Sequence, residues 1–205
     1  MKKGYIFDFD GVICDSEKFH YLAWKKVADT LNVSFSETEY FPFRSTGRLK
    51  VIEYLLSKKG IRFTEEIYAT LCAEKSSEYA RLTRSVGKSD LIKGVEEYIL
   101  NLYDKGYLLA VASSGSFASV LLDKLNLTRF FKVIIDGTTP LPKKPDPTIF
   151  INASEKLGVD ISDCVVFEDS VSGVQGAKKG GFTVVGVGGI KGDISIKDFT
   201  EKFDV

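Results

Sequence analysis

The chain has 205 residues, which suits one large domain or a core with a smaller partner, because domains usually have about 100 to 200 residues. Lysine and arginine total 28, and aspartate and glutamate also total 28, so the formal net charge is zero. This balance does not favour nucleic acid or an acidic membrane as a partner, and we expect neither.

The sequence also indicates the cellular compartment in which we expect the protein. No apolar run approaches the ~18 residues of a membrane span, and the first residues turn acidic at Asp8, unlike a signal peptide. The cysteines Cys14, Cys72 and Cys164 lack the paired spacing of a zinc site or a disulfide framework. We therefore expect a cytoplasmic, soluble protein with reduced thiols, and a monomer.

The first predicted element is a short buried strand over residues 5–7, which Gly11 ends. Asp8 and Asp10 follow the strand, one residue apart, where it gives way to a turn. In open parallel α/β sheets, ligands bind beyond this edge. An isolated pair of this kind is more often a polar turn, so its interpretation depends on signals further along the chain.

Residues 15–87 show helical periodicity and no convincing strand. We expect an all-helical cap domain there, inserted into a core domain of residues 1–14 and 88–205. An insertion after the first strand would lie above the edge that carries the two aspartates, and would therefore act as a lid.

The second half alternates between apolar runs rich in β-branched residues and helix-length segments. This alternation predicts βαβ units with right-handed crossovers, hence an α/β fold with a Rossmann-like parallel sheet and helices on both faces. The tail from residue 191 has no clear pattern. The expected strands cover residues 108–112, 133–135, 165–167 and 183–187, and the expected helices cover residues 95–105, 117–125, 147–157 and 172–179.

Polar residues follow these later strands. Ser113 and Ser114 open a helix, where backbone N–H groups and a hydroxyl suit a phosphate, although serine there is more often only a cap. Lys144 precedes another helix and can neutralise a phosphoryl group. Glu168 and Asp169 end a strand, and beside Asp8 they would repel it unless a divalent cation were present. Hard oxygen ligands at a phosphate site favour Mg²⁺.

Taken together, these acidic residues, the serine and the lysine resemble the haloacid dehalogenase superfamily over nearly the whole chain. Within that superfamily the resemblance is closest to the β-phosphoglucomutase-like branch. It implies a Mg²⁺-dependent enzyme that transfers the phosphoryl group of a small phosphorylated metabolite such as a sugar phosphate.

The resemblance also implies roles for the residues at matching positions. Asp8 would be the nucleophile that becomes an aspartyl-phosphate, and Asp10 the general acid/base. Ser113 and Lys144 would bind the phosphoryl oxygens, with Ser114 beside them. The implied ligands of Mg²⁺ are Asp8, the backbone carbonyl of Asp10, Asp169 and Glu168.

The expected cap carries two further segments that resemble this branch. His20, in the pattern His-x-x-Ala-Trp, would couple lid closure to the acid/base, and Trp24 of the same pattern is an expected substrate contact. The segment from Arg44 through Gly47 to Arg48 resembles the loop that reads substrate, and Arg48 would clasp the phosphate that is not transferred.

Three departures leave the substrate open. Arg44 stands where the mutases usually have lysine, Ser45 where they have glycine, and Phe117 where they have asparagine. We favour a mutase acting on hexose phosphates, with a phosphatase for a small phosphomonoester as the alternative. A halide-releasing dehalogenase and a non-catalytic binding protein on the same fold are the remote alternatives.

Overall fold

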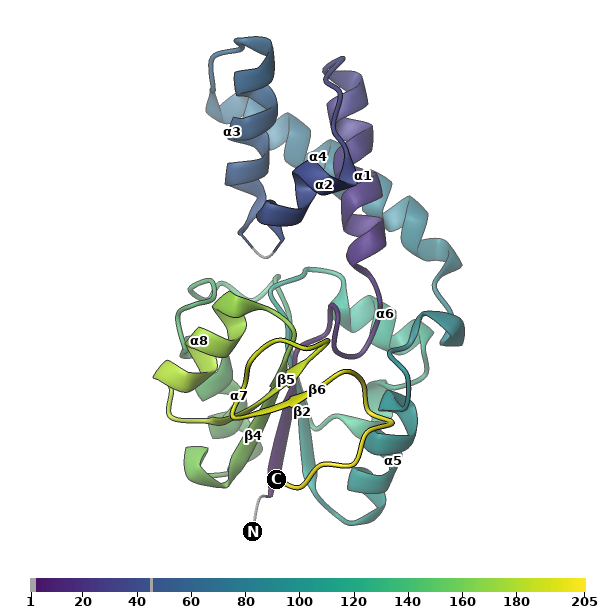
Figure 1. Cartoon of the computed structure of the whole chain (residues 1–205), viewed down its shortest axis with the longest axis vertical. Helices are drawn as coiled ribbons and strands as arrows, with labels where there is room; N and C mark the ends of the chain where they lie inside the picture. The colour runs from purple at the N-terminus through teal and green to yellow at the C-terminus, as the bar shows by residue number, and fades with distance from the viewer. Residues whose placement is uncertain (1–2, 45) are drawn as a thin grey trace. The chain divides into compact units, whose positions relative to one another are not determined.

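A computed structural model describes residues 3–44 and 46–205 (Figure 1). The chain divides into two compact units. The core unit consists of Met1–Asp15 with Val86–Val205, and the helical unit consists of Ser16–Ser85. Ser45, one of the departures noted above, lies outside the described residues.

The core unit is built on a six-stranded sheet whose strand pairs are all parallel, in the order β3-β2-β1-β4-β5-β6. This confirms the predicted Rossmann-like sheet, and five of its strands match the expected ranges to within one residue at each end. The sixth lies in the tail, where the sequence shows no clear pattern. The strands are β1 (Gly4–Phe7), β2 (Leu108–Ala112), β3 (Val133–Ile135), β4 (Cys164–Glu168), β5 (Thr183–Val187) and β6 (Ile194–Ile196).

In this order, β2 and β3 extend the sheet on one side of β1, whereas β4, β5 and β6 extend it on the other side. The chain therefore changes its direction across the sheet at β1. Phe7 lies opposite Val111 of β2 on one side and Phe167 of β4 on the other. The pairing with β4 continues into the next residue, since the backbone N–H of Asp8 donates to the Phe167 carbonyl at 2.9 Å. Crevices beyond the carboxyl ends of strands at such a switch point are where this kind of sheet binds ligands.

Helices cover both faces of the sheet. Ile6 and Val166 point to the face where Phe150 of α7 and Val174 of α8 complete one hydrophobic cluster, because successive side chains in a strand alternate between faces. The helices of the core unit are α5 (Val95–Asp104), α6 (Ala118–Lys124), α7 (Thr148–Leu157) and α8 (Val171–Lys179), with short 3₁₀ turns η3 (Lys88–Asp90), η4 (Thr128–Phe130) and η5 (Ile161–Asp163).

The opposite face of the sheet carries an aromatic cluster that includes the tail. The rings of Phe7 and Phe167 stack with centroids 4.6 Å apart. Tyr98 of α5 packs against Phe199 and Phe203 at 5.2 and 5.3 Å. The tail is thus ordered by aromatic packing, which a search for periodic patterns does not detect.

The helical unit has its own hydrophobic core, to which Trp24 of α1, Ile52 of α3 and Leu71 of α4 contribute. No strand occurs among its described residues. Its helices are α1 (Glu17–Thr30), α2 (Glu37–Tyr40), α3 (Arg48–Lys59) and α4 (Glu65–Leu82), with 3₁₀ turns η1 (Phe41–Phe43) and η2 (Thr83–Ser85).

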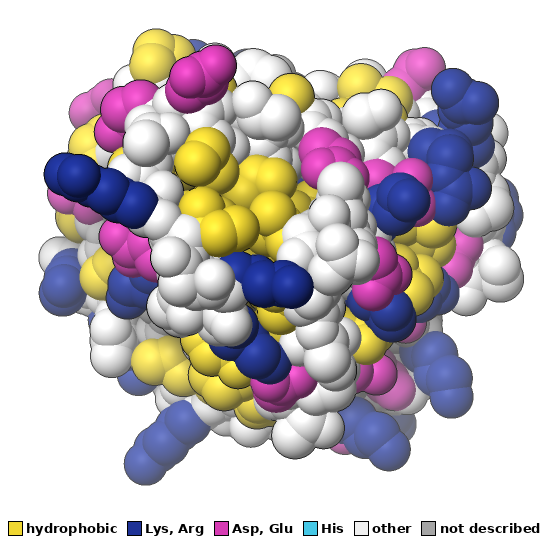
Figure 2. Space-filling model, turned by 90° about the horizontal axis from the view of Figure 1, so that it is seen from above, with side chains coloured by type: hydrophobic (Ala, Val, Ile, Leu, Met, Phe, Trp, Pro, Cys, Tyr) yellow, Lys and Arg dark blue, Asp and Glu magenta, His cyan; other side chains and the backbone are white. Residues whose placement is uncertain are grey.

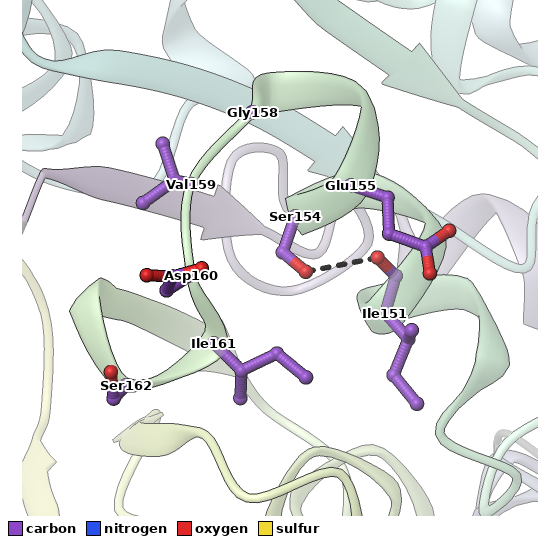
Figure 3. Close-up of a pocket in the computed structure, with 8 residues that line it drawn as sticks. All are labelled: Ile151, Ser154, Glu155, Gly158, Val159, Asp160, Ile161 and Ser162. Atoms are coloured by element: carbon purple, nitrogen blue, oxygen red, sulfur yellow. Dashed lines mark hydrogen bonds between the residues drawn. The ribbon is translucent and has the colours of Figure 1, made fainter.

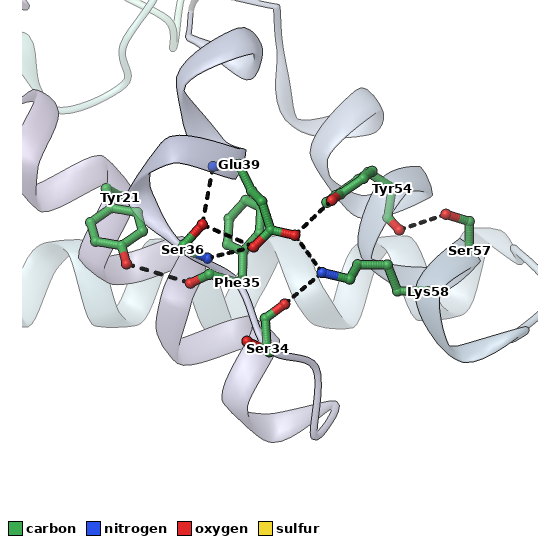
Figure 4. Close-up of polar contacts among 8 residues, drawn as sticks. All are labelled: Tyr21, Ser34, Phe35, Ser36, Glu39, Tyr54, Ser57 and Lys58. Carbon is green, nitrogen blue, oxygen red and sulfur yellow. Dashed lines mark hydrogen bonds and ion pairs between the residues drawn. The ribbon is translucent and has the colours of Figure 1, made fainter.

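Glu39 links two of these helices through a polar network (Figure 4). Its carboxylate accepts from the Ser36 backbone N–H at 2.8 Å, from the Tyr54 hydroxyl at 2.9 Å and from Lys58 Nζ at 2.6 Å. The hydrogen bond from Lys58, followed by those from Ser36 and Tyr54, lowers the pKa of Glu39 to about 2. The network therefore fixes α2 against α3.

The surface matches the balanced composition. On the face in Figure 2, basic and acidic side chains are interspersed, and neither sign dominates. Within residues 3–44 and 46–205, no helix combines the length and the apolar character that crossing a membrane requires.

Candidate active site

The loop after β1 brings two segments of the core unit into close contact. Asp8 is buried with 6% of its surface exposed, and Asp10 is half-buried. Gly11 has φ +76°, and a Cβ there would overlap the carboxylate of Asp169. Only glycine satisfies both conditions, so the sharp turn at Gly11 lets the segments after β1 and β4 meet.

Lys144 joins the ends of β1 and β4. Its Nζ lies 2.5 Å from Asp8 Oδ1 and also forms an ion pair with Glu168 Oε1. The other oxygen of Glu168 accepts from the backbone N–H and hydroxyl of Ser170, at 3.1 and 2.9 Å. Both oxygens of Glu168 therefore accept from protein donors, and Glu168 anchors the lysine.

The pKa values of Asp8 and Lys144 are set by burial and by each other's charge. Burial raises the pKa of Asp8; Lys144 opposes this, while Glu168, Asp169 and Asp10 raise it further. Burial alone would lower the pKa of Lys144, but the attraction of Asp8 and Glu168 raises it above its ordinary value. Lys144 thus pairs with two carboxylates, Asp8 and Glu168, and additional positive charge near Asp8 would stabilise its ionised form.

The donor set fits a divalent cation. Asp8, Glu168 and Asp169 each offer one carboxylate oxygen, and these oxygens lie within 4.8 Å of one another. Hard oxygen donors of this kind suit Mg²⁺ or a similar ion. The side chain of Asp10 does not belong to this group, and ligation by its backbone carbonyl stays a prediction.

The serine loop after β2 lies beside the same aspartates. Ser113 is fully buried, and its hydroxyl accepts from the Gly115 N–H at 3.0 Å. A Cβ on Gly115 would lie 2.8 Å from Asp10 Oδ2. Ser114 is exposed. The core unit therefore brings together Asp8, Asp10, Ser113, Lys144, Glu168 and Asp169, whose segments are far apart in the sequence.

In the helical unit, His20 contacts a buried lysine that sequence reasoning missed. Lys75 is 4% exposed, and its Nζ lies 2.7 Å from His20 Nδ1 and 4.3 Å from the ring centroid of Tyr79. The available signal was the spacing of Leu71, Lys75 and Tyr79, the buried residues of α4, which puts a charge in an apolar stripe. Trp24 is 3% exposed and packs in the core of the unit.

The two arginines of the expected substrate loop have different partners. Arg48 begins α3 and donates from Nη1 to the Ser76 hydroxyl at 3.0 Å. Arg44 pairs with Glu17 at 3.4 Å. Gly47 precedes α3 with φ +87°, a conformation that favours glycine.

A separate hollow lies near the end of α7, between Ile151, Ser154 and residues 158–162 (Figure 3). It shares no residue with the acidic cluster. The Ser154 hydroxyl donates to the Ile151 carbonyl at 2.9 Å, so it is already satisfied within the helix.

Known proteins resemble the chain over most of its length. The family model described as haloacid dehalogenase-like hydrolase matches residues 5–187. A β-phosphoglucomutase from Bacillus subtilis is 32% identical over 91% of this chain and 83% of its own length. A phosphorylated carbohydrates phosphatase from Thermotoga maritima is 30% identical over 86% of this chain and 80% of its own.

A solved structure gives the same result for the fold. The crystal structure of β-phosphoglucomutase from Clostridium difficile has a TM-score of 0.89 at 25% identity, covering 99% of this chain and 94% of that one. The chain therefore belongs to the haloacid dehalogenase-like hydrolase family, in its β-phosphoglucomutase-like branch, and is an enzyme of that kind.

Proposed function

We propose that the chain is a Mg²⁺-dependent phosphotransferase that works through an aspartyl-phosphate on Asp8, and that it interconverts hexose phosphates. The observation that carries this proposal is the buried ion pairing of Lys144 with Asp8 and Glu168, next to Asp169. The similarity to the Bacillus subtilis β-phosphoglucomutase supports the choice of a mutase.

In the first half-reaction, a carboxylate oxygen of Asp8 attacks the phosphorus in line with the leaving oxygen. The P–O bond to the leaving group breaks, and Asp10 gives that oxygen its proton. Lys144 compensates the charge on the phosphoryl oxygens, and Ser113 holds them. Asp8, the backbone carbonyl of Asp10, Asp169 and Glu168 would hold Mg²⁺, which would supply further positive charge to the phosphoryl group.

In the second half-reaction, Asp10 takes the proton of a sugar hydroxyl. The oxygen of this hydroxyl attacks the phosphoaspartate and restores the carboxylate of Asp8. A mutase results when the acceptor is a sugar phosphate. A phosphatase results when the acceptor is water.

We assign the choice of acceptor to the helical unit, as the cap of the core domain. Arg48 would clasp the phosphate that is not transferred, with Arg44, Gly47 and Ser114 as further substrate contacts. His20 would act on the acid/base. An ammonium can only donate, so Lys75 as an ammonium would make Nδ1 of His20 the acceptor and leave its proton on Nε2.

The second candidate is a phosphatase for a sugar phosphate. It is favoured by the 30% identity to the phosphorylated carbohydrates phosphatase of Thermotoga maritima. Both candidates use the same nucleophile. In either case we propose a cytoplasmic monomer that acts on a small phosphorylated metabolite.

The deciding experiment supplies β-glucose 1-phosphate, a trace of glucose 1,6-bisphosphate and Mg²⁺, and follows glucose 6-phosphate and inorganic phosphate separately. Glucose 6-phosphate as the main product would support the mutase. Inorganic phosphate alone would reject the mutase in favour of the phosphatase. Asp8→Asn serves as the control, because both products should disappear with it.

A further inference from the structure

Asp136 is a buried carboxylate that the proposed reaction does not use. It follows β3 directly and is 6% exposed. Its Oδ2 accepts from the Ser119 hydroxyl at 2.5 Å, and its Oδ1 accepts from the backbone N–H and hydroxyl of Thr138 at 3.0 and 2.6 Å. Burial would raise the pKa of Asp136, but the hydrogen bonds from Ser119 and Thr138 lower it below its ordinary value. The carboxylate is therefore ionised at neutral pH.

This carboxylate supplies the N-terminal cap that α6 lacks. Phe117, the residue before α6, makes no side-chain capping bond. The first N–H groups of a helix need acceptors from outside the helix, and negative charge is favourable there. Asp136 accepts from the Ser119 hydroxyl in the first turn of α6, and the backbone N–H of Ser119 also lowers the pKa of Asp136. It thus joins the end of β3 to the first turn of α6.

The neighbours of Asp136 hold the loop that leads into α6. The Ser113 N–H donates to the Ile135 carbonyl at 2.9 Å, and the Gly137 N–H donates to the Gly115 carbonyl at 3.1 Å. A Cβ on Gly137 would overlap the backbone carbonyl oxygen of Ser114. The segment after β3 therefore lies too close to the segment after β2 for any side chain at residue 137. Movement of residues 135–137 is therefore transmitted to residues 113–115.

That loop in turn lies against the proposed acid/base. Gly115 donates to the Ser113 hydroxyl at 3.0 Å, and the place of its missing Cβ is 2.8 Å from Asp10 Oδ2. A shift of Gly115 would change the surroundings of both side chains.

We propose that Asp136 is a positioning residue, which fixes residues 113–115 against Asp10 by joining β3 to the first turn of α6. The inference rests on the proposed function, because it assumes that this loop holds the phosphoryl group. Asp136 itself touches neither the substrate nor the reacting atoms.

The test compares Asp136→Asn, Ser119→Ala and Ser119→Thr with the wild type. Two quantities are measured: kcat and KM for β-glucose 1-phosphate with glucose 1,6-bisphosphate, and the rise in Tm caused by Mg²⁺ with the phosphate mimic trifluoroberyllate. Because small misplacements at a reacting centre have large effects on rate, Asp136→Asn should lower kcat by about 10- to 100-fold and reduce the Tm rise, with little change in KM.

Ser119→Ala should move both quantities in the same direction by less, and Ser119→Thr, which keeps the hydroxyl donor, should restore them. This pair keeps the test decisive if Asp136→Asn does not fold. The Tm rise is independent of which sugar phosphate is the true substrate.

Asp193→Asn is the matched control, since Asp193 also accepts a backbone N–H, from Val184 at 2.9 Å, near the start of β5. It should lower Tm without affecting kcat or the response to the mimic. The inference is wrong if Asp136→Asn and Ser119→Ala behave like this control. Failure of the proposed function is distinguishable, because then the wild type itself would form no glucose 6-phosphate, or Asp8→Asn would retain turnover.

Discussion

The core unit and the helical unit hold their charged side chains in different ways. In the core unit, Asp8, Lys144 and Glu168 form ion pairs in which no side chain is more than 8% exposed. In the helical unit, Arg44 is 45% exposed and pairs with Glu17, and Arg48 donates to the Ser76 hydroxyl. Because a guanidinium has five N–H donors, these arginines keep hydrogen-bonding capacity for a ligand. The buried ion pairs of the core unit suit groups that must stay in place during a reaction. The arginines of the helical unit suit the binding of a ligand.

Removing a carboxylate from the core unit should have the largest effect. Asp8→Asn deletes the proposed nucleophile and Asp10→Asn deletes the proposed proton donor, so each should lower turnover by at least about 10⁴-fold. The fold should survive, because asparagine has nearly the same shape as aspartate. Steady-state rates and circular dichroism check both statements, and near wild-type turnover in either variant would contradict the assigned role.

Removing the ammonium group of Lys144 should affect stability as well as rate. Lys144→Met leaves two buried carboxylates without their partner, which should cost about 3–5 kcal/mol in the free energy of unfolding at pH 7. Urea denaturation measures this cost. Lys143→Met is the matched control, because Lys143 is exposed and adjacent in sequence. Equal stability of the two variants would mean that the ion pairs do not hold the strand ends together.

Substitutions in the helical unit should change affinity more than rate. Arg48→Ala removes the proposed contact with the phosphate that is not transferred, worth about 1.5–3 kcal/mol, so KM for β-glucose 1-phosphate should rise at least about tenfold. Arg44→Ala should have a smaller effect, since Glu17 already compensates its charge. An equal rise in KM for both variants would remove the distinction between them.

The smallest expected effect is a pH-dependent loss of stability at Glu39. Its folded-state pKa of about 2 lies below its ordinary value of 4.5, so its contribution is present above pH 4.5 and is lost as the pH falls towards 2. Glu39→Gln should therefore lower Tm at pH 7 and match the wild type near pH 2. A difference in Tm that is the same at both pH values would show that the carboxylate charge is not its cause.

The parts of the molecule that were predictable are those with short-range patterns. The strand ends that carry Asp8 and Glu168 follow apolar runs, and parallel pairing brings such ends to one edge. The contact of Lys75 with His20 and the bond of Asp136 to Ser119 depend on tertiary packing between segments without a shared period. The position of Phe199 in the aromatic cluster was unpredictable for the same reason.

The ion pair between Lys144 and Asp8 spans 136 positions along the chain. Since β1 lies between β2 and β4, it has no neighbour in the sheet until much later segments leave the ribosome. Contacts of such long range slow folding, because loop closure must precede them. We therefore expect nascent chains that end before β4 to be inactive and to depend on protection from aggregation until that strand arrives.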